Sequence, residues 1–329
     1  MQTDNTASEV IAGFQQKDVE KQINTIKKKK YLMSYFPTWM NSLYADLKLF
    51  IDRKRGYTNL KKLFYNTVGY EINLDSPRSY NEKITWKKIY DRNPLLTITA
   101  DKYMVRYYIR DILGIEAAEE ILIPLYYVTG NPADIPFENL PDTYVVKPNH
   151  GSKMHIIIRD KKKVNSSEIR KICEEWLKFD FGLYQYEWAY RNIKRKIIVE
   201  KLLQEKNGCL PKDFKLYCFH GKCKMIRVSE NRFNNEDASA YYDIDWNLLP
   251  VTNPGYPSTD KYFAKPPNLN KMISISEKLS EKFDSVRVDL FNCNNKIFFG
   301  EITHYDASGM ARFEPEAFDY ELGLHWDIT

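Results

Sequence analysis

The residues SVRVDLFNCNNKIFFGEIT, at positions 285–303, decide the fold of this chain. Two runs of alternating residues flank Asn294-Asn295, which is typical of a β-hairpin with a tight turn. Asp289 and Glu301 stand on the two predicted strands, twelve positions apart. Because the side chains of a pleated strand alternate between its faces, both carboxylates can lie on one face of the hairpin.

Arg287 stands two residues before Asp289 and adds a cation to this pair of acids. Two carboxylates beside a guanidinium suit magnesium that holds a nucleotide triphosphate next to a developing negative charge. The alternative is a surface hairpin with scattered charge, which is the commoner meaning of such a pattern when it stands alone. Other segments of the chain must decide between the two.

The composition is that of a soluble globular protein, with 329 residues, 43% hydrophobic and 28% charged. This length suffices for one large domain or two lobes, each with its own core. The formal net charge is +5, and the run Lys27–Lys30 supplies most of the excess. Elsewhere acids and bases nearly balance, which argues against nucleic acid as a partner. The lysine run suits anionic lipid headgroups or a phosphate-bearing substrate, or it is a solvated helix face.

Five cysteines without a CxxC pair argue against both a disulfide framework and a zinc site. The sequence shows no apolar run long enough to span a membrane and no apolar core of a signal peptide. We therefore expect a cytoplasmic protein, with peripheral contact at the inner membrane face through the basic N-terminal arm as an option.

The order of predicted elements indicates an α+β fold with two β-rich lobes after a helical N-terminal region. Residues 1–30 form a flexible or helical basic arm, and helical spacing continues from Tyr31 to about Phe64, either packed on the body or lying on a membrane surface. A capping box at Ser79–Glu82 predicts the start of a helix. Further helices are predicted over 99–113, 167–178 and 268–283, and strands over 122–127, 142–147, 156–158, 196–203, 212–219, 222–229 and 239–244. The predicted parts are 1–30, 31–95, 96–195 and 196–329.

Several short segments outside the hairpin suit a nucleotide. Lys102 begins a helix, and Lys147 ends a strand before the turn that contains Gly151-Ser152; ammonium groups, backbone N–H groups and a hydroxyl there can hold phosphate oxygens. The backbone of Glu200-Lys201-Leu202 can contact an adenine edge, and the Asp213 carboxylate can bind ribose hydroxyls. Each signal is weak alone, since a strand-ending lysine is usually solvated, and only their joint order favours a nucleotide site.

That joint order resembles the ATP-grasp superfamily over about residues 95–312. Several short motifs are similar to those of the TupA-like (teichuronopeptide biosynthesis) ATP-grasp family. They include Asn81-Glu82-Lys83, Lys147-Pro148-Asn149-His150-Gly151-Ser152 and Phe299-Gly300-Glu301-Ile302-Thr303. The resemblance implies an ATP-grasp fold in which two β-rich subdomains, 96–195 with the phosphate loop and 196–329 with the metal-binding hairpin, clasp ATP and Mg²⁺. It implies catalytic roles for Arg287, Lys147 and Ser152, ATP contacts from Lys102, Lys147, His150, Gly151, Ser152, Glu200, Lys201, Leu202, Asp213, Lys215 and Arg227 (or Arg232), and metal ligation by Asp289, Glu301 and Thr303.

The same resemblance implies an ATP-dependent ligase that joins a carboxylate to an amine through an acyl phosphate. The family's association with bacterial surface polysaccharides implies an amino acid or other amine and a uronic-acid carboxyl of a glycan or sugar precursor as substrates. Tyrosines 184, 186 and 190 and the stretch 305–310 either line the acceptor cleft or pack between the lobes. Two alternatives stay open: a kinase or glycan-modifying transferase that acts on a hydroxyl, and a nucleotide-binding scaffold without catalysis.

Overall fold

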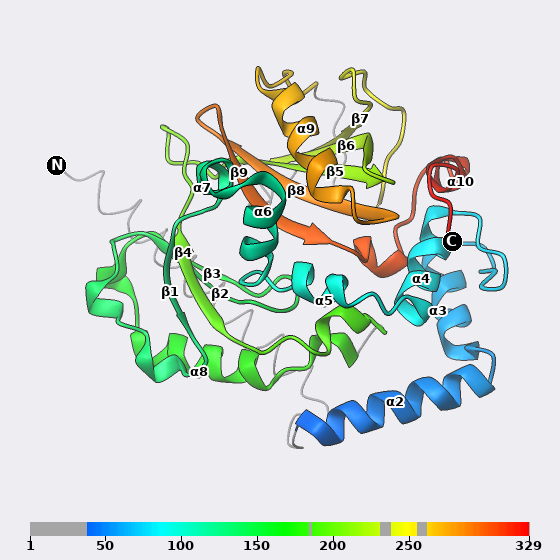
Figure 1. The fold of residues 1–329 in the computed structure, drawn as a ribbon, viewed down its shortest axis with the longest axis horizontal. Coiled ribbons are helices and arrows are strands. Elements are labelled where there is room, and N and C mark those ends of the chain that lie inside the picture. Colours follow the sequence, from blue (N-terminus) through cyan, green and yellow to red (C-terminus); the bar gives the residue numbers. More distant parts are fainter. Residues whose placement is uncertain (1–37, 184–185, 231–237, 255–261, 329) are drawn as a thin grey trace, which may run out of the picture.

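The structure is a computed structural model that describes residues 38–183, 186–230, 238–254 and 262–328. Two antiparallel sheets form two lobes with helices around them, so the predicted α+β class is confirmed (Figure 1). The predicted basic arm, the run Lys27–Lys30, Tyr184 and Arg232 lie outside the described residues.

The described helices and strands follow one another from α2 to α10 and from β1 to β9. The helices are α2 Thr38–Lys54, α3 Thr58–Val68, α4 Tyr80–Tyr90, α5 Pro94–Ala100, α6 Val105–Leu113, α7 Ile115–Ile121, α8 Ser166–Lys178, α9 Leu269–Ser280 and α10 Ala317–Gly323. The strands are β1 Leu125–Thr129, β2 Tyr144–Pro148, β3 Ile156–Ile158, β4 Ile197–Lys201, β5 Lys212–Phe219, β6 Lys222–Glu230, β7 Ala238–Tyr242, β8 Ser285–Cys293 and β9 Lys296–Thr303. Short 3₁₀ turns include η5 Phe181–Leu183, η6 Trp188–Tyr190 and η7 Asp306–Gly309.

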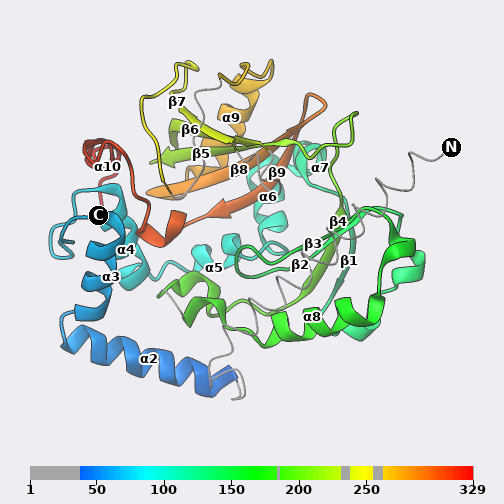
Figure 2. The ribbon, with the colours of Figure 1, turned by 180° about the vertical axis from the view of Figure 1, so that it is seen from behind.

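The first lobe contains a four-stranded sheet in the order β1-β4-β2-β3. Along β2, Tyr144 and Val146 are buried while Val145 and Lys147 are partly exposed, which is the period of two expected of a strand with one covered face. The buried set packs against Trp176 of α8. Helix α8 therefore covers one face of this sheet, and the face that carries Lys147 is turned toward α5, α6 and the second lobe (Figures 1 and 2).

The second lobe contains a five-stranded sheet in the order β7-β6-β5-β8-β9. Leu216 of β5 and Val288 of β8 are fully buried in the same core cluster as Met272 and Leu279 of α9. Because side chains alternate along each strand, the neighbours of Leu216 in β5 and of Val288 in β8 project from the opposite face of the sheet. That opposite face is polar, and it carries the acids of the predicted hairpin.

A β-bulge at Gly300 brings the two predicted acids of the hairpin together. Strands β8 and β9 pair regularly from Cys293↔Lys296 to Leu290↔Phe299, and the register then shifts so that Asp289 pairs with Glu301. Without this shift Asp289 would stand opposite Gly300, and Glu301 would project from the other face. The predicted same-face arrangement is therefore present, but it depends on the bulge and not on alternation alone.

The helix predicted over 99–113 is two helices, and their junction positions Lys102. The Asp101 carboxylate accepts hydrogen bonds from the backbone N–H groups of Tyr103 and Met104, at 2.8 and 3.2 Å. This carboxylate holds residues 101–104 in a turn between the two helices, so that α5 ends at Ala100 and α6 begins at Val105. The Lys102 backbone N–H donates to the Asn149 carbonyl at 2.9 Å, which ties the junction to the loop after β2.

The N-terminal and C-terminal helices pack together beside the second lobe (Figure 1). The predicted capping box is confirmed, because the Ser79 hydroxyl accepts from the Glu82 N–H and the Glu82 carboxylate accepts from the Ser79 N–H. The Asp319 carboxylate of α10 accepts from the Tyr70 hydroxyl at 2.6 Å and from the Asn81 backbone N–H at 3.0 Å. Among the described residues, no helix combines the length and apolarity that a membrane crossing requires.

Candidate active site

A row of polar side chains crosses the five-stranded sheet on the face opposite α9. Direct register pairs link Tyr241, Arg227, Lys215, Asp289 and Glu301 in succession from β7 to β9. Paired residues of neighbouring antiparallel strands project on the same side, so these five side chains share one face. The first four are 2–3% exposed. Glu301 lies at the end of the row, where a third of its side chain stays exposed.

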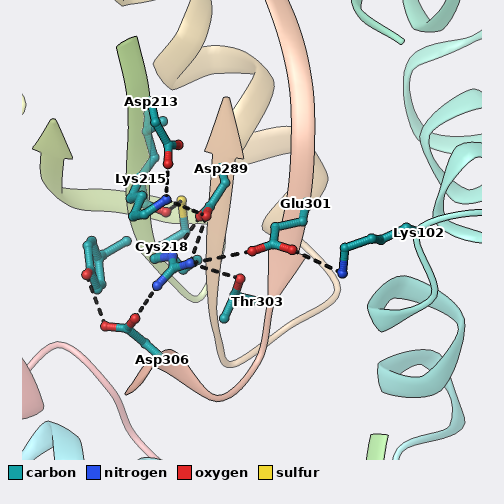
Figure 3. A network of polar contacts seen from close by, with 11 residues as sticks. Lys102, Asp213, Lys215, Cys218, Asp289, Glu301, Thr303 and Asp306 are labelled. Atoms are coloured by element: carbon teal, nitrogen blue, oxygen red, sulfur yellow. Dashed lines mark hydrogen bonds and ion pairs between the residues drawn. The ribbon is translucent and has the colours of Figure 1, made fainter. Parts of the chain in front are cut away.

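Arg287 donates hydrogen bonds to Asp289, Thr303 and Asp306, three residues that Figure 3 labels. Its guanidinium donates to both carboxylate oxygens of Asp289, at 2.6 and 2.7 Å, and to the Thr303 hydroxyl at 3.1 Å. The Asp306 carboxylate accepts a hydrogen bond from Nη1 of Arg287 and another from the Tyr217 hydroxyl at 3.0 Å. Burial disfavours the charge, but Asp289 and Asp306 hold the pKa of Arg287 well above its usual value. Arg287 is therefore a fixed cation in a buried setting.

Lys215 completes the neutralisation of Asp289. Its ammonium group lies 2.9 Å from Asp289 and 2.5 Å from Asp213, and all three side chains are buried. Burial opposes ionisation of Asp289, but Arg287 and Lys215 outweigh it and hold the pKa of this carboxyl well below its usual value. Asp289 is therefore ionised at neutral pH, and both its oxygens already accept hydrogen bonds.

Lys102 connects the two lobes at the exposed end of the row. Its ammonium group donates to the Gly151 carbonyl at 2.7 Å. It also lies 3.3 Å from the Glu301 carboxylate, a contact drawn in Figure 3. Gly151 belongs to the predicted phosphate loop after β2, whereas Glu301 belongs to the predicted metal-binding hairpin. One ammonium group thus brings together two predicted elements that are 150 positions apart in the sequence.

A second ion pair lies on the two central strands of the first lobe, on the face of the sheet opposite α8. The Lys147 ammonium group lies 2.5 Å from the Glu200 carboxylate, and Arg106 of α6 lies 3.9 Å from the same carboxylate. Glu200 is buried, while Lys147 keeps 17% of its side chain exposed. The next residues after Glu200 alternate, with Lys201 exposed and Leu202 buried. Arg106 was not among the predicted site residues.

The predicted phosphate loop after β2 places His150, Gly151 and Ser152 in three different environments. Gly151 has φ of +78°, where only glycine is unstrained, and a Cβ there would lie 2.4 Å from Met154. Ser152 is exposed. His150 is buried, and its Nε2 lies 3.1 Å from the carbonyl oxygens of both Trp176 and Phe179. Burial and the neighbouring Arg195 lower its pKa to about 3, so the imidazole is neutral and packed on α8, and only its backbone faces the loop.

The donor set at the hairpin fits magnesium only when phosphate supplies further ligands. Asp289, Glu301 and Thr303 offer oxygen atoms, which are what magnesium prefers, and Glu301 is partly exposed. Asp289 would have to exchange Arg287 or Lys215 for the ion. In the part of the chain that the structure describes, no three His, Cys, Asp or Glu side chains form a metal cluster. Magnesium in nucleotide sites commonly has one or two protein carboxylates, with phosphates and water completing its shell.

The aromatic stretches mainly pack within the protein. Tyr190 contacts Phe181 and Tyr305 with ring centroids 5.0 and 6.5 Å apart, and Tyr186 donates its hydroxyl hydrogen bond to Asp52. In the stretch 305–310, Tyr305, Asp306 and Ser308 are 2–6% exposed. Their packing supports the structural alternative for these side chains. Asp306 was predicted only as part of this stretch, and its contact with Arg287 was not predicted, because an isolated acid after a strand has no distinguishing pattern in sequence.

Comparison with known proteins finds one matching family and several solved structures with a similar chain trace. The family described as TupA-like ATPgrasp matches residues 82–326. No curated protein sequence matches the chain.

Three solved structures illustrate the likeness. D-alanine–D-alanine ligase from Helicobacter pylori is 14% identical with a TM-score of 0.40, covering 75% of this chain and 69% of that one. The corresponding ligase from Bacillus anthracis, complexed with ATP, is 15% identical with a TM-score of 0.38, covering 64% and 55%. The ATP-grasp ligase PsnB with a minimal precursor is 9% identical with a TM-score of 0.37, covering 64% and 54%. The chain thus spans little more than half the length of the last two.

Proposed function

Because the chain belongs to the TupA-like ATP-grasp family, we propose that it is an ATP- and magnesium-dependent ligase that joins a carboxylate to an amine through an acyl phosphate. One observation carries this proposal. Lys102 contacts both the proposed phosphate loop at Gly151 and the acidic hairpin at Glu301, so the segments that we propose to hold phosphate and magnesium meet at one place.

The ion pairs of the site suit an exchange of partners on nucleotide binding. Lys102 and Lys147 are each paired with a partly or fully buried acid, Glu301 and Glu200. Phosphate oxygens can replace these acids at the two ammonium groups, and Glu301 is then released to hold magnesium. Magnesium, when bound, neutralises charge on the phosphates as the γ-phosphoryl group is transferred. Backbone groups of residues 200–202 would contact the adenine, and Asp213 the ribose.

Arg287 is suited to stabilise the charge that develops on the reacting carboxyl group. A free carboxylate is a poor electrophile, because its own charge repels an attacking amine. Attack of the carboxylate oxygen on the γ-phosphorus expels ADP and leaves an acyl phosphate; the amine then attacks the carbonyl carbon, inorganic phosphate leaves, and the amine nitrogen loses a proton. Arg287 is held by Asp289, Asp306 and Thr303, so it needs little reorganisation to interact with the oxygens of these states.

For the substrates, we propose a uronic-acid carboxyl of a surface glycan or its precursor, and an amino acid as the amine. Support comes from the family, because TupA-like proteins are associated with teichuronopeptide biosynthesis, which involves uronic acids. No nucleophilic side chain is required by this chemistry, because ATP itself activates the carboxylate.

Hydroxylamine trapping tests the proposal. The protein is incubated with Mg²⁺, ATP and a panel of uronic acids, with hydroxylamine in place of the amine. A ligase forms a hydroxamate and releases ADP only when its carboxylate is present. A stable phosphoester with ADP release would instead show a kinase that acts on a hydroxyl, and nucleotide binding without any turnover across the panel would favour a scaffold. Glu301→Gln is the negative control, since it removes a proposed magnesium ligand.

A further inference from the structure

Helix α2 has an apolar face that points outward. Leu43, Leu47 and Phe50 are spaced by four and three residues, so they lie on one side of the helix, and they expose 63%, 54% and 57% of their surface. Ile51 extends this side and is 38% exposed. We call these four residues the α2 outer face. In both views α2 runs along the edge of the molecule, away from the two sheets (Figures 1 and 2).

Helix α2 is held on the body by polar contacts and by Leu49, which packs partly buried against the cluster that contains Leu60 and Phe64. Asp52 lies about half a turn around the helix from Leu43, is 8% exposed and accepts a hydrogen bond from Tyr186. Asp46 pairs with Arg191 at 2.8 Å, and the Lys48 ammonium group lies 5.4 Å from the centre of the Tyr186 ring. An ordinary surface helix turns its apolar side inward and its polar side to water. Helix α2 departs from this pattern, because Leu49 packs inward while Leu43, Leu47 and Phe50 point to solvent.

The surroundings of the α2 outer face are basic. Between Thr38 and Val68 the chain has six Lys or Arg and two Asp, a local net charge of +4. Both acids, Asp46 and Asp52, are already bound to groups of the protein. Lys54 lies over the Phe50 ring at 5.7 Å, on the outer side itself. The remaining exposed cations are Arg53, Arg55, Lys61 and Lys62.

We propose that the α2 outer face docks the protein on an anionic lipid bilayer. Apolar side chains ringed by Lys and Arg are the signature of a helix that lies in the membrane interface. A protein partner fits less well, because the centres of protein interfaces are depleted of lysine. A second copy of this chain would bring a like charge of +4 against the same surface. Anionic headgroups neutralise that charge while the acyl region accepts the apolar side chains.

This inference stands independently of the proposed ligase activity. The docking face lies outside both lobes and shares no residue with the candidate active site. It also differs from the predicted contact through the basic arm, since it rests on described residues of α2 and α3. Loss of docking and loss of catalysis are therefore separate experimental outcomes.

Vesicle flotation of the full chain tests the proposal. Vesicles of phosphatidylcholine are compared with vesicles of phosphatidylethanolamine and phosphatidylglycerol, and the fraction of protein that floats is measured. We expect binding to the anionic vesicles, weakened by added salt. Leu47→Gln with Phe50→Gln should lower the partition coefficient by at least about ten-fold. Exchange of Lys61 for Gln should lower it by about five-fold, the contribution of one charge near the surface.

The matched control changes exposed apolar residues elsewhere on the molecule. Ile115→Gln with Leu324→Gln alters side chains that are 70% and 81% exposed, and it should leave binding unchanged. The proposal is overturned by absent binding, by equal binding to both vesicles, or by binding that the Leu47 and Phe50 changes do not affect. A dimer that these changes dissociate would assign the face to a second copy. A lower melting temperature of the double variant would show that another segment of the chain covers it.

Discussion

Replacing each hairpin acid by its amide should separate the structural role of Asp289 from the ligand role of Glu301. The two residues pair directly across β8 and β9, so the comparison holds position nearly constant. Asp289 is 3% exposed and accepts hydrogen bonds from Arg287 and Lys215. Glu301 is one-third exposed and has longer contacts, 3.3 Å to Lys102 and 3.9 Å to Arg287.

These contacts set different costs for the two substitutions. Asp289→Asn removes the anion that neutralises two buried cations, and breaking a buried pair costs about 3–5 kcal/mol of unfolding free energy. Glu301→Gln affects contacts near solvent, which are worth less than about 1 kcal/mol. Turnover and magnesium-dependent nucleotide affinity should still fall at least about ten-fold in Glu301→Gln, the scale of a lost metal contact.

Urea unfolding followed by circular dichroism measures the stability of both variants, and calorimetric titration with Mg²⁺ and ADP measures affinity. A free-energy difference of at least about 2 kcal/mol between the variants is expected, with Asp289→Asn the less stable. Equal stability would refute the claim that Asp289 is committed to Arg287 and Lys215. Unchanged nucleotide affinity in Glu301→Gln would refute the metal role.

Three further predictions concern the bulge, the C-terminal helix and the first lobe. Gly300→Val places a Cβ about 3.0 Å from the Asp289 carbonyl oxygen. This substitution should lower the free energy of unfolding in urea by about 1–3 kcal/mol and abolish magnesium-dependent ADP binding. The control Gly130→Ala, whose Cβ would have nothing within 4 Å, should change neither quantity. Burial, opposed by the Tyr70 and Asn81 hydrogen bonds, raises the pKa of Asp319 from 3.8 to about 6. The folded protein then binds the Asp319 proton more tightly than the unfolded chain does. The contribution of Asp319 to the free energy of unfolding therefore falls by up to about 3 kcal/mol as pH rises from about 4 to about 6. Unfolding of Asp319→Asn should lack this fall in stability, and an identical fall would disprove the assignment. Lys147→Ala should weaken ADP binding at least about ten-fold in calorimetry, and an unaltered affinity would remove Lys147 from the phosphate site.

The regular elements of the second lobe were predictable because their alternation and turns are local. Strand β5 coincides with the predicted 212–219, and the turns at His220-Gly221 and Asn294-Asn295 have the positive φ values that such hairpins need. The turn between α5 and α6 was not predicted, because the apolar residues of 99–113 keep helical spacing across the turn that the Asp101 carboxylate stabilises. Gly300 was the available signal for the bulge, since glycine inside a strand commonly marks one.

The candidate site was predictable in its members and less so in their contacts. Lys102, Lys147, Arg287 and Glu301 could be selected by residue type and by family resemblance. Asp306 and Arg106 could not, since their importance comes from which cation or acid the fold brings beside them. For the same reason the sequence did not reveal that Asp289 is fully engaged, or that the ring of His150 is packed on α8.

If both lobes hold one magnesium-bound nucleotide at Lys102, a crystal structure with Mg²⁺ and ADP will show it. We expect phosphate oxygens within hydrogen-bonding distance of Lys102 and Lys147, with the Lys102–Glu301 contact opened and the adenine beside residues 200–202. A nucleotide bound elsewhere, with the Lys102–Glu301 and Lys147–Glu200 pairs intact, would contradict it.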